Sequence, residues 1–194
     1  MTPRLVLAST SRYRKALLGR LGVPFAQASP GVDEGPLMGS GRSPEAIAGA
    51  LAEAKARAVA AREPGAYVLG GDQVVDLDGE VLGQPGTLAG CEAQLERLSG
   101  RTHVLRTAMA LVAPDGRLER QVHATRLTLR SLGAEEIARY VASERPVDCC
   151  GAYRIEGPGI ALFARIEGDD PSAIEGLSLI ALAGWLRDAG FKVP

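Results

Sequence analysis

The feature that most constrains the fold is a β-hairpin predicted in the middle of a chain that otherwise alternates strands and helices. Two long strand patterns, at about 102–113 and 117–130, are joined by the turn sequence Pro114-Asp115-Gly116. Strands joined by so short a turn run antiparallel, whereas strand–helix alternation builds parallel pairs. The chain is therefore predicted to be an α/β protein with a mixed sheet, not a purely parallel one.

Caps and turn residues predict the elements around this hairpin. Ser9, Thr10 and Ser11 lie where the first helix needs its amides capped, and Ser43 is the predicted N-cap of a second helix. A third helix is predicted from Thr87 to Gly100. Asp78-Gly79 predicts a second hairpin. The remaining predictions are a strand at 5–8, a long surface loop at 22–42, a helix near 134–144, a buried strand at 159–168 and a closing helix at 176–190.

The first of these helices begins with an unusual charge pattern. The stretch LVLASTSRYRKALL, residues 5–18, passes from an apolar strand through three hydroxyl residues to Arg12, Arg14 and Lys15. A helix N-terminus is already positive and ordinarily favours acidic residues in its first turn. An anion bound at that end would reverse the cost of the cations, so the pattern raises the question of a phosphate site.

Composition excludes several classes of function. The chain has 194 residues, 46% of them hydrophobic, which is enough for one large domain or two small lobes. Its net charge of -1 and aromatic content of 4% argue against binding to nucleic acid polymers. No window is long and apolar enough to span a membrane. Three cysteines, two of them adjacent, favour a reducing, cytoplasmic location.

Familiar catalytic motifs are absent from the sequence. It contains no Walker A motif, Gly-rich dinucleotide fingerprint or nucleophile elbow. His103 and His123 fall on opposite arms of the central hairpin, where both are best interpreted as ordinary strand residues. The remaining carboxylates, cations and hydroxyls suit metal-assisted attack of water on phosphorus better than covalent catalysis.

The most informative stretch for chemistry is LGGDQVV, residues 69–75. A strand runs into Gly70-Gly71 and then presents Asp72, so the backbone could pass a ligand closely beside a rigidly held carboxylate. Taken alone, Asp72 is at least as well explained as a turn residue. Bland alternatives also exist for four other candidates: solvated charge for Glu34, a snorkelling surface lysine for Lys55, a partly exposed packing residue for Tyr13 and a strand end for Glu156.

Together these stretches resemble the Maf family of nucleotide pyrophosphatases. The resemblance covers essentially the whole chain through GVDE, LAEAKA, GGDQVV, SGRTHVLRTAMALV and AYRIEGPGIALFARIEGDDPSAIEGLSLIAL, in that order. It implies an elongated, two-lobed α/β fold shared with inosine-triphosphate pyrophosphatases, with residues 1–194 as a single domain. It also implies hydrolysis of a nucleoside triphosphate to the monophosphate and pyrophosphate with a divalent metal, Mg²⁺ or Mn²⁺.

The resemblance also assigns roles to individual residues. Asp72 matches the catalytic acceptor, Ser9, Arg14 and Lys15 match the phosphate-binding first turn, and Glu34 and Lys55 match other polar site residues. Tyr13, Gln73 and Glu156 match the positions that distinguish substrate branches. From their chemistry, Lys55 is expected to join the phosphate-binding residues and Asp72 and Glu34 to bind the metal, with Asp72 serving as base for the attacking water, as metal ligand or as both.

Those three substrate-branch residues are similar to the branch that acts on 7-methyl-GTP. Methylation at N7 makes the guanine ring system cationic, so Tyr13 could hold it by stacking with cation–π character, worth ~0.5–2 kcal/mol. Glu156 could accept hydrogen bonds from the guanine N1–H and exocyclic amine. The rival substrates are dTTP and UTP, and the rival class is a non-catalytic nucleotide-binding regulator of cell division.

Two residues depart from the family pattern. Gln84 stands where the family usually has lysine, which questions efficiency more than reaction type, and Ser178 stands in place of the usual proline at the start of the last helix. A homodimer is a family expectation that no feature of the sequence tests. The expected partner is otherwise the nucleoside triphosphate substrate, without nucleic acid or membrane.

Overall fold

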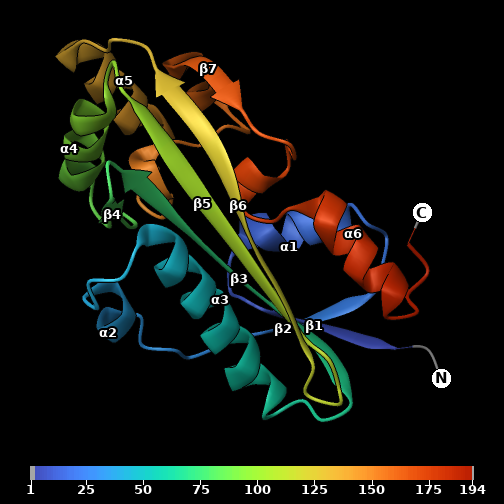
Figure 1. The fold of residues 1–194 in the computed structure, drawn as a ribbon. Coiled ribbons are helices and arrows are strands. Elements are labelled where there is room, and N and C mark those ends of the chain that lie inside the picture. Colours follow the sequence, from blue (N-terminus) through green and yellow to red (C-terminus); the bar gives the residue numbers. More distant parts are fainter. Residues whose placement is uncertain (1–2, 194) are drawn as a thin grey trace. The chain divides into compact units, whose positions relative to one another are not determined.

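The computed structural model describes residues 3–193, which fall into two compact units (Figure 1). The first unit is built from residues within 1–72, 107–123 and 170–194, and the second from 73–106 and 124–169. The first unit is thus assembled from three separate stretches of chain. Residues from both ends of the sequence contribute to it.

Seven strands form a mixed sheet with the order β2-β1-β3-β5-β6-β7, and β4 pairs with β3 off this path. β1 pairs in parallel with β2 and β3, whereas β4 and β7 run antiparallel to β3 and β6. The predicted mixed α/β fold is confirmed. The strands are β1 (Arg4–Ala8), β2 (Phe25–Ala28), β3 (Ala66–Leu77), β4 (Glu80–Leu82), β5 (Thr102–Val112), β6 (Leu118–Leu129) and β7 (Phe163–Glu167).

The helices are α1 (Arg12–Gly19), α2 (Gly35–Met38), α3 (Pro44–Ala60), α4 (Leu88–Leu98), α5 (Ala134–Glu144) and α6 (Leu179–Asp188), with short 3₁₀ segments η1 (Cys150–Ala152), η2 (Pro158–Leu162) and η3 (Ala173–Glu175). Across residues 3–193, none of these helices has the length and apolar character needed to cross a bilayer.

In the first unit, helices cover both faces of the sheet (Figure 1). Successive residues of a strand point to opposite faces. Accordingly Leu5 and Leu7 of β1 pack in a cluster with buried leucines of α1 and α6, while Val6 and Ala8 pack in another with Val59 of α3. This three-layer arrangement places α1 and α3 on opposite sides of β3.

The second unit has its own packing. Helix α4 packs against α5 and η1. Beside them lies an aromatic cluster in which the Tyr153 ring meets Phe163 edge-on at a centroid distance of 5.0 Å. His103 completes this cluster, with its Nε2 atom 2.9 Å from the Tyr153 hydroxyl.

The predicted cap at Ser43 and the predicted hairpins are confirmed because their signals are local. Of the three hydroxyl residues before α1, Ser11 is the cap, and Thr87, where a helix is predicted to begin, caps α4. As at Ser43 before α3, each side chain accepts a hydrogen bond from a backbone amide in the first turn. Asp78 and Gly79 both adopt positive φ angles, 54° and 89°, as the tightest hairpin turns require.

Two predicted segments differ from the structure. The loop expected at 22–42 contains β2 and α2, because β2 finds a parallel partner in β1 that only the tertiary fold supplies. The buried strand expected at 159–168 is also wrong. Pro158 begins a 3₁₀ segment there, and the strand that follows, β7, is mostly exposed.

Candidate functional site

The site is organised by two adjacent glycines in β3, one for each face of the strand. A Cβ atom on Gly70 would lie 2.2 Å from the Ala52 carbonyl oxygen, so the glycine allows α3 to pack directly on the strand. On the other face, a Cβ on Gly71 would lie 3.2 Å from Nε of Arg14. The glycine pair therefore brings α3 and the Arg14 side chain close to the backbone that leads into Asp72.

The α3 face carries a buried ion pair. Lys55 lies within the buried stripe of α3 and is itself only 8% exposed. Its Nζ atom is 2.5 Å from Oδ1 of Asp72, which is 5% exposed, and 2.6 Å from Oε1 of the half-exposed Glu34. One ammonium therefore holds two carboxylates at one point, and Lys55 is not a snorkelling surface residue.

The Arg14 side chain lies on the other face of β3, with its donors only partly used. Its Nε donates to the Gly176 carbonyl over 3.2 Å. Within residues 3–193, its two Nη groups find no hydrogen-bond acceptor. The positive charge of the guanidinium lowers the pKa of Asp72 electrostatically. Arg14 is held in position through Nε and keeps its two Nη groups available for a ligand.

Burial dominates the acidity of Asp72. Removal of the carboxylate from water raises its pKa, and the positive charges of Lys55 and Arg14 only partly offset this effect. The group is thus more basic than an ordinary aspartate. A carboxylate with this property is better suited to accept a proton from water than an exposed one.

The other predicted phosphate-binding residues lie at the start of α1. Ser9 is buried, its Oγ accepts from the Ser11 amide over 3.1 Å, and its carbonyl accepts from Gln27. Lys15 is exposed on the first turn of the helix. Tyr13 is half-buried, and the Arg12 guanidinium lies 4.8 Å from the centroid of its ring.

The remaining predicted residues belong to the second unit. Gln73 follows Asp72 on β3, and its carbonyl lies 3.0 Å from Sγ of Cys150. Glu156 is exposed in a turn before η2, so its predicted position at a strand end is wrong. Gln84 uses its amide to donate to the Asp148 carbonyl over 3.0 Å and thereby joins two loops of this unit.

Asp72 and Glu34 also fit the ligand set of a hard divalent cation. Both offer carboxylate oxygens within hydrogen-bond distance of the same ammonium, so both reach one small region. No group of three or more metal-binding side chains occurs among residues 3–193. Such a pair suits Mg²⁺, which is commonly bound by one or two carboxylates together with substrate phosphates and water.

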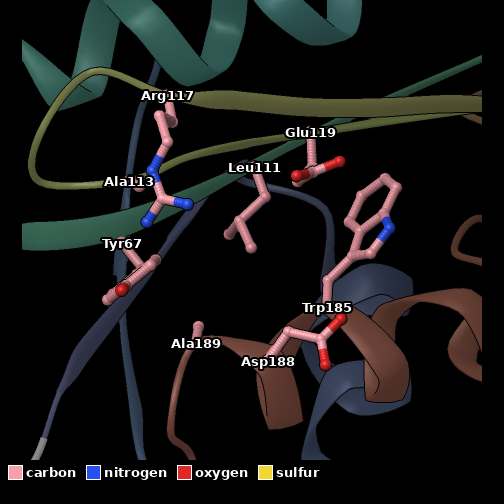
Figure 2. Close-up of a pocket in the computed structure, with 8 residues that line it drawn as sticks. All are labelled: Tyr67, Leu111, Ala113, Arg117, Glu119, Trp185, Asp188 and Ala189. Carbon is pink, nitrogen blue, oxygen red and sulfur yellow. The ribbon is translucent and has the colours of Figure 1, made fainter.

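A cavity elsewhere in the first unit does not include these residues. It has a volume of about 260 Å³ and is lined by Tyr67, Leu111, Ala113, Arg117, Glu119, Trp185, Asp188 and Ala189 (Figure 2). Tyr67 lies near the start of β3, five residues or ~17 Å along the strand from Asp72. Arg117 is the cation among the residues that line it, and its exposed guanidinium pairs with Asp115 over 2.7 Å.

Sequence reasoning did not single out Gly176, whose carbonyl accepts from Arg14, or Asp170, which is bonded within the same segment before α6. Asp170 is only 4% exposed and accepts four hydrogen bonds. The available signal was Asp-Pro-Ser at 170–172, a spacing at which an aspartate commonly bonds to the amide two residues ahead. In a polar stretch such a signal predicts a turn, with no indication of what the turn supports.

The chain is similar in sequence to known proteins over nearly its whole length. The family model described as Maf-like protein matches residues 4–189. A protein named 7-methyl-GTP pyrophosphatase from Xanthomonas campestris pv. campestris (strain 8004) is 51% identical over 194 residues and covers 100% of both chains. Proteins of the same name from Xanthomonas oryzae pv. oryzae (strain KACC10331 / KXO85) and Aromatoleum aromaticum (strain DSM 19018 / LMG 30748 / EbN1) are 52% and 48% identical, with 100% and 98% of each chain covered. Matched over nearly its whole length, the chain belongs to the Maf family.

Proposed function

We propose that this protein hydrolyses a nucleoside triphosphate, preferably 7-methyl-GTP, to the monophosphate and pyrophosphate. The observation that carries the proposal is the buried Asp72, which contacts Lys55 on one face of β3 and is near the guanidinium of Arg14 on the other. A carboxylate between two cations provides one group to activate water and two to bind phosphate. The names of relatives about half identical to this chain support the same reaction.

Each residue has a part in the proposed reaction. Asp72 accepts a proton from the attacking water, which its raised pKa favours. Arg14, Lys15 and Lys55 stabilise the negative charge that develops on the leaving pyrophosphate. Ser9, whose Oγ accepts from the Ser11 amide at the entry to α1, helps to orient the phosphates at the positive end of the helix.

Asp72 and Glu34 are the residues that would hold the divalent metal, Mg²⁺ or Mn²⁺. When bound there with substrate, the ion would neutralise phosphate charge and acidify a coordinated water. Before that, Lys55 occupies the space between the two carboxylates and keeps them from repelling each other. In the proposed reaction its ammonium also serves as one of the cations that bind the substrate's phosphates.

Base choice is assigned to Tyr13, Gln73 and Glu156. Tyr13 supplies an aromatic face for the cationic methylated ring, and the exposed Glu156 carboxylate has acceptors for the guanine N1–H and amine. This proposal treats residues 1–194 as one functional domain. Glu156→Gln should lose the preference for 7-methyl-GTP over GTP, and an unchanged preference would remove Glu156 from this role.

The test is pyrophosphate release from 7-methyl-GTP, GTP, dTTP and UTP, with Mg²⁺, Mn²⁺ or a chelator, for wild type and Asp72→Asn. Selective, metal-dependent turnover of 7-methyl-GTP that is lost in the variant is the expected result. Turnover of dTTP or UTP instead would retain the reaction and reject the assigned base choice. Tight nucleotide binding without turnover would favour the regulator of cell division.

We also propose a cytoplasmic location and a nucleotide as the principal partner. The chain has three cysteines, two of them adjacent, a pattern that favours a reducing compartment. Fractionation tests the location. Light scattering of the purified protein tests whether it forms the homodimer expected from its family.

A further inference from the structure

The segment from Asp170 to Ile180 is closed by a single carboxylate. Oδ1 of Asp170 accepts from the amide and hydroxyl of Ser172, and Oδ2 accepts from the Ser178 hydroxyl over 2.7 Å and the Ile180 amide over 2.9 Å. Burial alone would raise the pKa of this carboxyl, but the four hydrogen bonds lower it overall. Asp170 therefore stays ionised and fixes the shape of the loop that precedes α6.

The same segment is attached to the rest of the first unit at three points. The Thr107 hydroxyl of β5 donates to the Ala173 carbonyl over 2.9 Å. Arg20, at the end of α1, forms a bidentate ion pair with Glu175. Leu177 is fully buried in the core cluster shared with α1 and α6. The loop is thus held both internally and from outside.

What this framework presents to the site is the Gly176 carbonyl. Gly176 has a φ of 119°, which side-chain-bearing residues rarely adopt, and its carbonyl accepts from Nε of Arg14. A Cβ on Gly176 would lie 3.3 Å from Cγ of Arg14, and one on Gly71 would lie 3.2 Å from Nε. The Arg14 side chain is therefore confined between two glycines, with its Nη groups left available.

We propose that Asp170 is a positioning residue for Arg14, acting through the Gly176 carbonyl to hold the guanidinium ready for a phosphate. The proposal rests on the proposed function, because it assumes that Arg14 binds the substrate's phosphates. A free arginine loses considerable side-chain entropy when it binds, and a guanidinium fixed in advance avoids much of that cost. Asp170 itself contacts no substrate in this scheme.

Ser178 allows a milder change to the same loop. Its hydroxyl supplies one of the four hydrogen bonds to Asp170. Alanine has no hydroxyl and could not donate that bond. Ser178→Ala should therefore reproduce, at smaller amplitude, the effect of changing Asp170, without altering any residue that touches Arg14.

The first arm of the test needs no catalysis. The Arg14 Nε–H signal in a ¹⁵N correlation spectrum should exchange slowly with solvent in the wild type, because it donates to a backbone carbonyl. Asp170→Asn should accelerate that exchange at least tenfold, and Ser178→Ala less. Asp169→Asn, the same change at the exposed neighbouring acid, is the matched control and should leave the signal unchanged.

The second arm is a double-mutant cycle on pyrophosphate release. Asp170→Asn should lower kcat/KM about tenfold through a higher KM, and should have less than a twofold effect when Arg14 is already glutamine. If the effects of Asp170→Asn and Arg14→Gln on kcat/KM multiply in the double variant, Asp170 acts only on the fold and the proposal is overturned. Unchanged Arg14 exchange in Asp170→Asn would also overturn it. If no nucleotide is hydrolysed, the proposed function fails and the exchange measurement alone decides the positioning role.

Discussion

Two aspartates in the first unit, Asp72 and Asp170, are almost equally buried, but their surroundings shift their pKa values in opposite directions. Asp72 is 5% exposed, is satisfied mainly by an ion pair, and has a raised pKa. Asp170 is 4% exposed, is surrounded by four hydrogen-bond donors, and has a lowered pKa. Burial alone therefore does not decide the acidity of a carboxylate. The nature and number of its partners determine whether it remains basic.

The sharpest test of this contrast is Asp72→Asn. The amide cannot accept a proton from water, so turnover should fall by about 10²–10⁴-fold, the usual contribution of a general base. The cooperative thermal unfolding transition should persist, because asparagine preserves the shape of the side chain. Near-normal turnover measured by pyrophosphate release would remove Asp72 from the mechanism and end the contrast.

A histidine in the second unit shows the effect of burial on a side chain that becomes positively charged when it binds a proton. His103 is 2% exposed, and burial lowers its pKa to about 4. Between the ordinary value of 6.5 and 4 the unfolded chain binds the proton first, so stability should fall as pH falls through this range. The full loss, at ~1.4 kcal/mol for each pH unit, amounts to about 3 kcal/mol.

This loss is measured as the difference in unfolding free energy between wild type and His103→Gln across pH 4 to 7. The variant should lose the His103 contribution and therefore unfold with a shallower acid limb. His123→Gln, at the other histidine of the chain, is the control and should leave that contribution in place. Equal acid limbs in wild type and His103→Gln would contradict the assigned cause.

Asp170→Asn should lower the stability of the fold, whereas Asp72→Asn should leave the unfolding transition in place. An amide in place of the carboxylate leaves at least one donor of Ser172, Ser178 or Ile180 without an acceptor, so the free energy of unfolding should drop by about 1–3 kcal/mol. Denaturant unfolding measures this change. Asp169→Asn should be nearly neutral, and an equal loss in that control would mean that net charge, not the hydrogen bonds, is responsible.

The smallest effect is a difference in pH slopes. The stability contributed by Asp170 is present above the ordinary carboxyl pKa of 3.8 and is lost as pH falls through its lowered value. The contribution of Asp72 is present at low pH and is lost as pH rises through its raised value. Subtracting each asparagine variant from wild type, without metal, should give slopes of opposite sign in acid solution. Parallel slopes would show that the two sites do not differ in this way.

Much of the fold could be predicted because its signals are local. Caps at Ser11, Ser43 and Thr87 and the turn at Asp78-Gly79 depend on a few neighbouring residues, and all are present. The 22–42 segment could not be predicted, because β2 depends on pairing with β1. In the 159–168 segment the apolar pattern predicts a buried strand, but Pro158 begins a 3₁₀ segment there instead.

The site was predictable only in part, for a related reason. Gly70-Gly71 before Asp72 correctly suggested a close approach of other groups to the strand. Lys55, however, looks like a surface residue until α3 is packed on β3, because only then does the charge become buried against Asp72. Which residue meets which face of a strand is a property of the tertiary packing.

The discontinuous first unit has a consequence for the order in which the protein is made. Asp72 and Lys55 are synthesised early and Arg14 earlier still, but Gly176 and Asp170 belong to the last stretch of this unit. A nascent chain that ends before residue 170 carries the acid and its lysine but not the carbonyl that holds the arginine. The support for Arg14 would thus arrive only near the end of translation, after both residues of the buried ion pair have been synthesised.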